Sequence, residues 1–322
     1  MKAASVSAVI VTYRSRLHIG RCVHSLIDEG ILEIWVVDNA SDDDTASYVS
    51  EHFPEAHLIQ NSENIGFAAA NNQALQRIAT PFVLLINPDA WLEKGSLRHM
   101  LTEIEQHDDV AVVGPRMIRD EQIEPSLLYA PRIRDVWFFL LSGMRAFGSG
   151  GFSGRMADGY PWDAGGEGNH VRGSCMLVRM QAVREAGFLD ESFFLYFEET
   201  EWCLRMHRHG WRIMLNAHAI AHHIGKASVR THGTLPSLEY MRSAILFWHK
   251  VYPAPAAWLL RTTLLLMAVT KWLILGVLDR KDTDRRRWLG DVVRLSMDPY
   301  RLPIVYSHAR RPRSWPRRRQ DA

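Results

Sequence analysis

The sequence predicts an α/β fold built on a doubly wound, mostly parallel sheet, and three observations lead to that fold class. Short apolar runs alternate with segments of helical periodicity over about the first hundred residues. Residues 82–86 are apolar throughout, which is typical of a strand buried on both faces. Polar residues follow several of the apolar runs directly. Because ligands bind such sheets at the carboxyl ends of the strands, these polar residues indicate where a site would lie.

The same patterns predict the elements in chain order. The apolar run 6–11 is the first strand, and Ile19, Val23, Leu26 and Ile27 share one face of the helix that follows. After Asn64–Gly66, a turn leads into a helix, and the acidic and aromatic segment 198–209 is a later helix. The further strands are expected at 33–37, 58–60, 82–86, 111–114, 175–178, 213–215 and 219–222. The stretch 120–168, rich in Gly and broken by prolines, is expected to be an irregular acceptor-side region.

Length and composition set the broad class of the protein. The 322 residues are 47% hydrophobic and 23% charged, enough for one large core or for a catalytic domain with an appendage. The three cysteines are widely spaced and form no CxxC pair, so a disulfide framework and a cysteine metal site are not expected. The first residues lack the features of a signal peptide. A reducing cytoplasm is therefore the predicted compartment.

The C-terminal third changes in character. Residues 236–300 are predicted to form amphipathic and apolar helices after a catalytic domain at 1–235, and 301–322 a basic tail. The apolar run 256–278 contains Arg261 and Lys271, so three arrangements stay open: helices lying in one leaflet, a membrane span and a soluble core helix. The arginine clusters at 285–287 and 310–319 suit a polyanion, and the expected partner is an anionic membrane surface, with no nucleic acid.

Two carboxylates stand at the ends of predicted strands. Asp89 follows the buried strand 82–86 and can ligate a hard cation such as Mg²⁺ or Mn²⁺, which a diphosphate leaving group needs. Asp38 ends the second strand, where an acid commonly reaches the ribose or base of a nucleotide. The structural alternative for Asp89 is a strand end that caps a turn.

The turn after the first strand excludes several enzyme classes. It reads Thr12-Tyr13-Arg14-Ser15-Arg16, where a dehydrogenase would carry G-x-G-x-x-G. The chain also lacks the Gly-Lys-Ser/Thr of a P-loop, so kinase and ATPase interpretations have no basis.

A second set of acids begins the helix 198–209. Glu198, Glu199 and Glu201 lie within four residues, and aromatic side chains on both sides include Trp202. An apolar environment raises the pKa of a carboxylate toward the range of a general base, although acids also stabilise a helix N-terminus without any catalytic role. His222 and His223 end a later strand and could complete a metal site, bind phosphate or lie at the surface.

Taken together, these segments resemble family 2 of the inverting glycosyltransferases, which has the Rossmann-like GT-A fold, and especially the bacterial rhamnosyltransferase branch. The resemblance covers about 220 residues in order. The matching segments are AVIVTYRS at 8–15, VVDNASDD at 36–43, NIGFAAANNQAL at 64–75, LLINPDA at 84–90, RGSCMLVR at 172–179, GFLDESFFLYFEETEWCLRMHRHGW at 187–211 and AHHIGKAS at 221–228.

The resemblance implies roles for individual residues. The nucleotide-sugar site would comprise Thr12, Tyr13, Arg14, Asp38, Asn39, Asn64, Gly66, Phe67, Asn71, Asn87 and Asp89. Residues on the acceptor side would be Arg172, Gly173, Ser174, Glu201 and Trp202. Asn87-Pro88-Asp89 stands where the family has its Asp-x-Asp-like metal motif, so the metal would rest chiefly on Asp89, with His222 as a second ligand. Glu199 stands where the family has the Asp of its Glu-Asp base motif, and Glu198 remains the alternative base.

The expected reaction is a single inverting displacement at the anomeric carbon of a nucleotide diphosphate sugar. The resemblance suggests rhamnose from deoxythymidine diphosphate rhamnose as the donor and a lipid-linked or cell-surface glycan as the acceptor. It also suggests an enzyme on the inner face of a bacterial membrane. A sugar nucleotidyltransferase is an alternative, but it needs a Gly-rich phosphate loop after the first strand. A non-catalytic nucleotide-sugar-binding membrane protein is another, but it gives no reason for Asp89 and Glu199 together.

Overall fold

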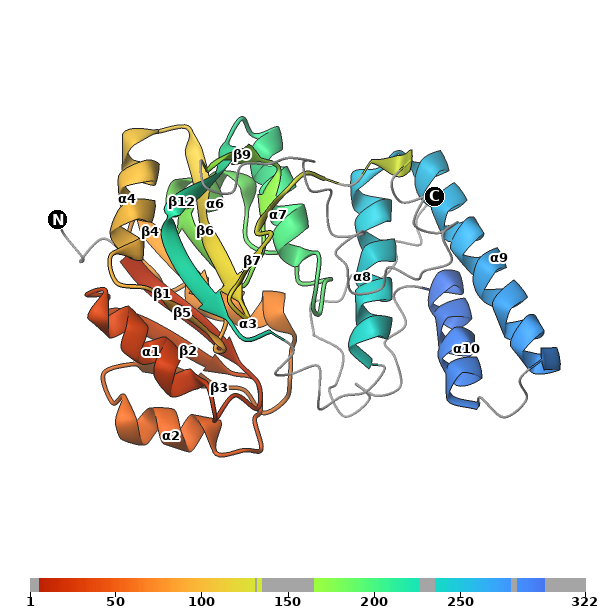
Figure 1. The fold of residues 1–322 in the computed structure, drawn as a ribbon, viewed down its shortest axis with the longest axis horizontal. Helices are drawn as coiled ribbons and strands as arrows, with labels where there is room; N and C mark the ends of the chain where they lie inside the picture. The colour runs from red at the N-terminus through yellow and green to blue at the C-terminus, as the bar shows by residue number, and fades with distance from the viewer. Residues whose placement is uncertain (1–5, 131, 135–164, 226–234, 279–282, 299–322) are drawn as a thin grey trace, which may run out of the picture. The chain divides into compact units, whose positions relative to one another are not determined.

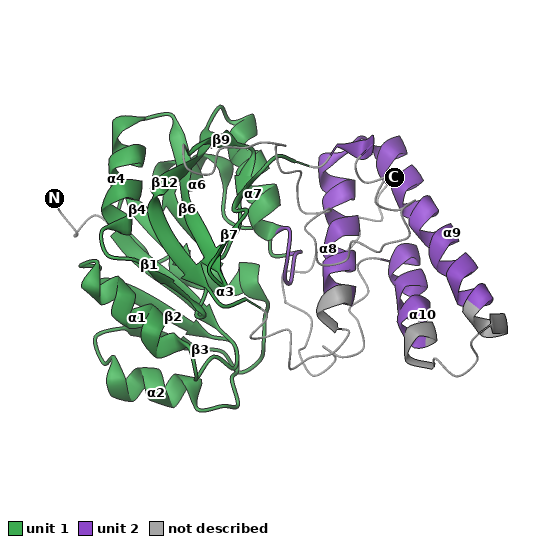
Figure 2. Cartoon of the chain, in the orientation of Figure 1, with its two compact units in different colours: residues 1–130, 156–191, 198–231 green, residues 131–155, 192–197, 232–322 purple. Residues whose placement is uncertain are grey.

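The computed structural model describes residues 6–130, 132–134, 165–225, 235–278 and 283–298 (Figure 1). The chain divides into two compact units (Figure 2). The first comprises Met1–Ala130, Met156–Glu191 and Glu198–Thr231, and the second comprises Pro131–Arg155, Ser192–Phe197 and His232–Ala322. The domain bounds expected at 235 and 300 remain predictions. The basic tail at 301–322 and much of the irregular region, residues 135–164, lie outside the described residues.

The first unit is built on a ten-stranded sheet with the order β3-β2-β1-β4-β11-β6-β12-β5, to which β7 and β9 are added at β6 and β12. The strands are β1 Val6–Thr12, β2 Glu33–Asp38, β3 His57–Gln60, β4 Phe82–Ile86, β5 Ala90–Leu92, β6 Val110–Arg119, β7 Gln122–Glu124, β9 Gly166–Gly168, β11 Cys175–Arg179 and β12 Arg212–His223. A separate two-stranded sheet pairs β8 Leu127–Leu128 with β10 His170–Val171. The predicted α/β class with a large central sheet is confirmed.

Strand direction divides the sheet into two parts. β3, β2, β1 and β4 are parallel, so their carboxyl ends meet at one edge. β11 then runs antiparallel to both β4 and β6, whereas β12 is parallel to β6. The two short strands predicted near 213 and 219 are one long strand, β12, whose pairing with β6 shifts register between Asn216 and Ile220.

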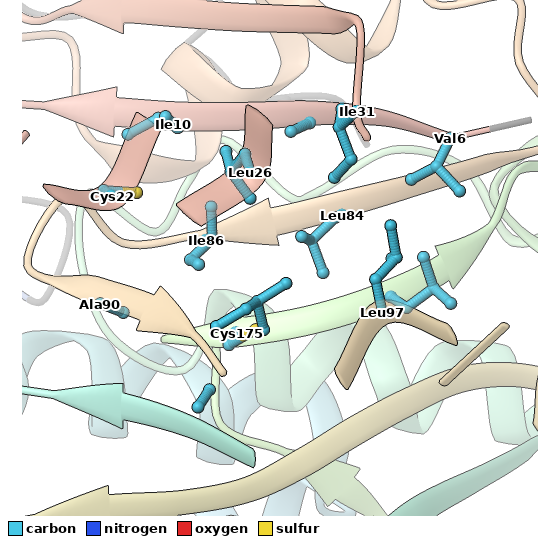
Figure 3. Packing of buried hydrophobic residues seen from close by; sticks show 14 of the residues in the cluster. Val6, Ile10, Cys22, Leu26, Ile31, Leu84, Ile86, Ala90, Leu97 and Cys175 are labelled. Atoms are coloured by element: carbon cyan, nitrogen blue, oxygen red, sulfur yellow. The ribbon is translucent and has the colours of Figure 1, made fainter. Parts of the chain in front are cut away.

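Helices cover both faces of this sheet because its strands are apolar on both sides. Along β1, Ile10 faces a cluster with α1 (Ile19–Asp28), α2 (Thr45–His52) and α4 (Ser96–Gln106), part of which Figure 3 shows. Val9 and Val11 face the opposite cluster with α3 (Phe67–Leu75), α6 (Met180–Ala186) and α7 (Glu198–Arg208). The helix at 19–28 buries Ile19, Val23 and Leu26 as predicted, but Ile27 is exposed.

The second unit contains three described helices: α8 Leu235–Val251, α9 Ala254–Leu278 and α10 Thr283–Met297. Met241, Ala244, Ile245 and Trp248, the apolar stripe of α8, are fully buried. Pro253 separates α8 from α9, as expected where proline interrupts a helical pattern. Among the described residues, Ala254–Ile274 is the one helical stretch long and apolar enough to cross a bilayer by length and composition.

Candidate active site

The edge of the sheet expected to bind the nucleotide begins where β1 and β2 end. Their parallel register places Thr12 beside Asp38. The Thr12 hydroxyl donates a hydrogen bond to Asp38 Oδ1 at 2.8 Å, and the backbone N–H of Ser41 donates to Oδ2 at 3.0 Å. Both side chains are buried. Asp38 is thus held at the end of β2 as a hydrogen-bond acceptor.

Neighbouring loops extend this edge. The side-chain amide of Asn39 donates to the carbonyl of Gly66, and the Gly66 N–H donates to Asn64 Oδ1 at 3.0 Å. Gly66 has a φ of 90°, which a side chain would disfavour, so glycine suits this turn into α3. Asn71 is buried within α3 and donates to the carbonyl of Phe67. The structure therefore ties the 64–71 segment to the end of β2.

Tyr13 and Arg14 continue the turn after β1. The Arg14 guanidinium forms a two-point ion pair with Asp42, with both N–O distances at 2.6 Å. The pair is largely exposed, and the guanidinium also lies 5.3 Å from the centre of the Tyr13 ring. Arg14 thus lies at the surface directly after β1, with its guanidinium held by Asp42.

Asp89 lies just beyond β4, and its partner is His223. Asp89 Oδ1 is 3.3 Å from His223 Nε2, and both side chains are 12% exposed. Burial opposes the ionisation of Asp89, but the hydrogen bond and charge of His223 outweigh it, and the pKa of Asp89 is lowered. The carboxylate is therefore charged at neutral pH and still reaches solvent.

His223 connects Asp89 to a second buried carboxylate, Glu124 at the end of β7. His223 Nδ1 is 3.4 Å from Glu124 Oε2, while Arg119 and Arg172 approach Oε1 at 2.7 and 3.5 Å. Burial lowers the pKa of His223, but the two carboxylates on its two nitrogens outweigh burial and raise that pKa to about 9. The ring is thus an imidazolium at neutral pH.

The charge of Arg172 also acts on the predicted base, Glu199. Arg172 is close enough to Glu199 for its positive charge to lower the pKa of that carboxyl. A Cβ added at Gly173 would lie 3.4 Å from the Glu199 side chain, so Glu199 packs beside the position where Gly173 has no side chain. The carbonyl of Ser174 accepts a hydrogen bond from the backbone N–H of Asn87 at 3.0 Å. The 172–174 segment therefore joins Glu199 to the loop that carries Asp89.

Glu199 has the environment expected of a base. Burial is the largest influence on it and raises its pKa, although nearby hydrogen bonds and Arg172 act in the other direction. The residue as a whole is only partly covered. Glu198, the alternative, is buried with 4% of its surface exposed.

Three of the predicted residues are not brought to this cluster. Glu201 forms an ion pair with Arg205 one turn later, at 2.9 Å. Trp202 is fully buried in the core, and its indole N–H donates to the carbonyl of Gly187. His222 stacks on the ring of Trp91 and lies 2.6 Å from Glu93.

The structure also adds two residues that the sequence analysis missed, Arg119 and Glu124, and it places His223 rather than the expected His222 beside Asp89. His222 and His223 are adjacent on β12, and side chains alternate across a strand, so only one of the two can face Asp89. The sequence showed the histidine doublet but could not choose between them. Glu124 lies in the stretch 120–168 that the sequence predicted to be irregular, so no periodicity pointed to it. In the structure it is the last residue of β7.

A divalent cation fits at Asp89 if most of its ligands come from outside the described side chains. In the part of the chain that the structure describes, no three His, Cys, Asp or Glu side chains are grouped to hold a metal ion. Asp89 offers one ionised hard oxygen ligand, which suits Mg²⁺ or Mn²⁺ when other ligands come from a diphosphate and water. His223 could add an imidazole nitrogen only after losing its proton.

Comparison with known proteins identifies the class. Residues 7–157 match the model of glycosyl transferase family 2. Over these residues the chain is similar to glycosyl transferase family 2. Over 207 residues it is 30% identical to the low-salt glycan biosynthesis hexosyltransferase Agl10 of Haloferax volcanii, covering 63% of this chain and 62% of that protein. The chain thus spans less than two thirds of that relative's length.

A second relative matches over more of this chain. It is an N-acetylglucosaminyl-diphospho-decaprenol L-rhamnosyltransferase of Mycobacterium tuberculosis, 25% identical over 285 residues, which cover 80% of this chain and 90% of the relative.

Solved structures support the GT-A fold. A mannosyltransferase from Pyrobaculum calidifontis, in complex with GDP-Man and Mn²⁺, matches with a TM-score of 0.53 at 16% identity, covering 91% of this chain and 87% of that one. GalNAc-T7 with UDP, GalNAc and Mn²⁺ matches with a TM-score of 0.55 at 12% identity, covering 95% and 57%. At these identities the similarity establishes the fold alone.

Proposed function

We propose that this protein transfers a sugar from a nucleotide diphosphate donor to an acceptor hydroxyl with inversion at the anomeric carbon. The observation that carries the proposal is the set of neighbouring groups between Asp89 and Glu199: Asp89, His223, Glu124 and Arg172 contact one another in turn, and the charge of Arg172 acts on Glu199. One end of this set supplies charge for a leaving diphosphate, and the other supplies a base. Inverting transfer needs both functions within one site.

The residues divide the work as follows. Thr12 and Asp38 bind the nucleoside at the edge of the sheet, and Asp89 holds the divalent cation. When bound, that cation would neutralise charge that develops on the leaving diphosphate. Glu199 accepts the proton of the acceptor hydroxyl, whose oxygen bonds to the anomeric carbon as the bond to the diphosphate oxygen breaks. The nucleotide diphosphate leaves with the electron pair, and the single displacement inverts the centre.

For the general base, we favour Glu199 over Glu198. Glu199 is partly open and packs beside Gly173, whereas Glu198 is almost fully buried. Arg172, Gly173 and Ser174 line the acceptor side in this proposal. The positive charge of the arginine favours the carboxylate form of Glu199 and partly offsets the effect of burial, which raises its pKa.

For the metal, we propose His223 in place of His222 as the residue that completes the Asp89 site. His223 lies beside Asp89, whereas His222 is held between Trp91 and Glu93. Mn²⁺ and Mg²⁺ both suit a carboxylate ligand.

For the donor and acceptor, we propose rhamnose from deoxythymidine diphosphate rhamnose and a lipid-linked diphosphate glycan. The mycobacterial relative, which matches over 285 residues, carries both a rhamnosyl donor class and a decaprenol-linked acceptor in its name. A panel of nucleotide sugars in a thermal-shift assay, with and without Mn²⁺, tests the donor. A donor at 100 times its Kd is expected to add about 2.7 kcal/mol of stability.

The transfer assay then decides the reaction class. Release of the nucleotide diphosphate together with a glycosylated acceptor supports the proposal. Release of pyrophosphate would indicate a sugar nucleotidyltransferase, and donor binding without any turnover would indicate a non-catalytic binding protein.

For localisation, we propose that α9 docks on an anionic membrane surface at the cytoplasmic side. Leu259, Leu266 and Leu273 recur every seven residues on its exposed side and lie 54%, 63% and 55% exposed. Arg261 is turned away from that side and donates to the carbonyls of Ser296 and Met297 at the end of α10. The exposed stripe is therefore apolar, while the sequence places arginine clusters at 285–287 and 310–319 nearby in the chain.

Replacing Leu266 with aspartate is expected to lower binding to phosphatidylglycerol vesicles by about tenfold, because burying a leucine contributes about 1.5 to 3 kcal/mol. Sedimentation with vesicles measures the effect. Leu32→Asp is the matched control, since Leu32 is 80% exposed and lies in the first unit. Equal binding by the Leu266 variant and the control would contradict docking through α9.

A further inference from the structure

The chain crosses into the second unit just before the proposed base. Glu191 belongs to the first unit, Ser192–Phe197 to the second, and Glu198 to the first again. The first residue of α7 is Glu198, and Glu199 follows it. Residues 192–197 lead directly into the helix that carries the base. Contacts that fix the backbone of these residues therefore also fix where that helix begins.

A buried ion pair on α8 holds one end of this segment. Glu239 and Arg242 are both fully buried, with Arg242 Nε 3.0 and 3.1 Å from the two Glu239 oxygens. Both terminal nitrogens of the guanidinium donate to the carbonyl of Ser192 at 3.4 Å. Buried charges are costly, and an apolar pair often packs with equal or better stability. Because Arg242 also donates hydrogen bonds to the backbone carbonyl of Ser192, the pair fixes the backbone there as well as filling the core.

Ser243, next to Arg242 on the same helix, holds the middle of the segment. Its hydroxyl donates to the carbonyl of Leu195 at 2.7 Å and lies 3.4 Å from Glu239 Oε1. One hydrogen-bonded network of three side chains on α8 thus binds two carbonyls of the 192–197 segment. Such networks define a single arrangement when all their members are satisfied.

The last two residues of the segment have strained backbone. Tyr196 and Phe197 have φ angles of 70° and 68°, a region that bulky side chains rarely adopt. Their rings pack on α8: Tyr196 and Phe197 lie 5.5 and 5.1 Å from the ring of Tyr240, and Phe197 lies 5.2 Å from that of Phe247. Strain of this kind persists only where the surroundings hold it, and it is found at functional sites.

We propose that Glu239, Arg242 and Ser243 are positioning residues for the base: through the backbone of residues 192–197 they set the start of α7 and hence the place of Glu199. They touch neither substrate nor reacting atoms. This inference rests on the proposed glycosyl transfer and extends it, because it makes turnover depend on the second unit. Donor binding through Thr12, Asp38 and Asp89 does not depend on it.

The test uses the full chain with Glu239→Gln and Arg242→Met combined, which removes both charges and leaves neither buried alone. We expect kcat to fall by about 10 to 10² fold, since a shift of about 1 Å in a catalytic group has effects of that size. The KM for the donor and the donor's thermal shift should change less than about twofold. The acid limb of the pH–kcat profile should move, because Glu199 changes its surroundings.

Asp291→Asn with Arg294→Met is the matched control. That pair has the same i, i+3 spacing on α10 of the same unit, and its kcat should equal that of the wild type. A folded Glu239/Arg242 variant with wild-type kcat and pH profile would overturn the proposal.

Ser243→Ala decides the matter if the double variant does not fold. It removes a single hydrogen bond to Leu195, and we expect kcat to fall by severalfold at unchanged donor KM. An unchanged kcat would overturn the proposal. Failure of the proposed transferase function would give a different result. The wild type itself would then show no sugar transfer that depends on Glu199, whatever the α8 variants do.

Discussion

Replacing Glu199 with glutamine is expected to lower kcat by about 10² or more while donor binding stays nearly intact. Glutamine keeps the size of the side chain and its packing beside Gly173, but it cannot accept the proton of the acceptor hydroxyl. Loss of an interaction that acts only in the transition state lowers kcat and kcat/KM equally. Steady-state kinetics of transfer, together with the thermal shift produced by the donor, measure both parts of this result.

The pH profile provides the second measurement for Glu199. Burial raises the pKa of this carboxyl, with Arg172 as a partial counterweight. The base works when it is unprotonated, so kcat should be full above that raised pKa and fall as the pH drops through it. Glu199→Gln should lose this acid limb. Glu198→Gln is the matched control, and if it loses turnover while Glu199→Gln keeps it, the role of base belongs to Glu198.

Replacing Asp89 with asparagine is expected to lower turnover by about 10³ and to abolish most of its dependence on Mn²⁺. A metal at a leaving diphosphate is worth several kcal/mol of transition-state stabilisation, and each 1.36 kcal/mol is about a factor of ten in rate. Asparagine keeps the shape of the side chain but removes the ionised oxygen that makes Asp89 a hard ligand. The measurement is donor hydrolysis and transfer across a titration of Mn²⁺, compared with the wild type.

The two histidines supply the control for this prediction. His223→Ala should weaken the response to Mn²⁺, because His223 is the ring that contacts Asp89. His222→Ala should leave it nearly unchanged, because His222 contacts Glu93 and Trp91. A loss of the Mn²⁺ response in His222→Ala alone would restore the ligand predicted from the sequence. Equal hydrolysis by Asp89→Asn and wild type would remove Asp89 from the metal site.

The edge of the sheet expected to bind the nucleotide could be predicted from sequence because it depends on local pattern. Apolar runs give β1, β2 and β4, and the polar residues that follow them must lie at the ends of those strands. Parallel strands then bring Thr12 and Asp38 together, as their 2.8 Å hydrogen bond shows. The acid cluster at 198–201 was predicted for similar reasons, since three carboxylates in the first turn of a helix are visible without any tertiary information.

Other parts of the site depend on contacts between distant residues, which no local pattern records. The antiparallel strand β11 between β4 and β6 carries the 172–174 segment to Glu199, and its apolar sequence gave no sign of its direction. Trp202, one residue from the acids, is a core side chain because α7 turns that face toward the sheet.

The sequence alone determined the α/β fold class, the strand ends that hold Thr12, Asp38 and Asp89, and the resemblance to family 2, because each follows from residues close together in the chain. Only the tertiary structure decided that His223 faces Asp89 in place of His222, and that Glu124 joins it to Arg172. Glu124 and His223 are 99 positions apart, and their meeting depends on how β7, β6 and β12 align. Strand register sets which of two adjacent side chains faces the site, and register is fixed by packing between strands rather than by the residues of one strand.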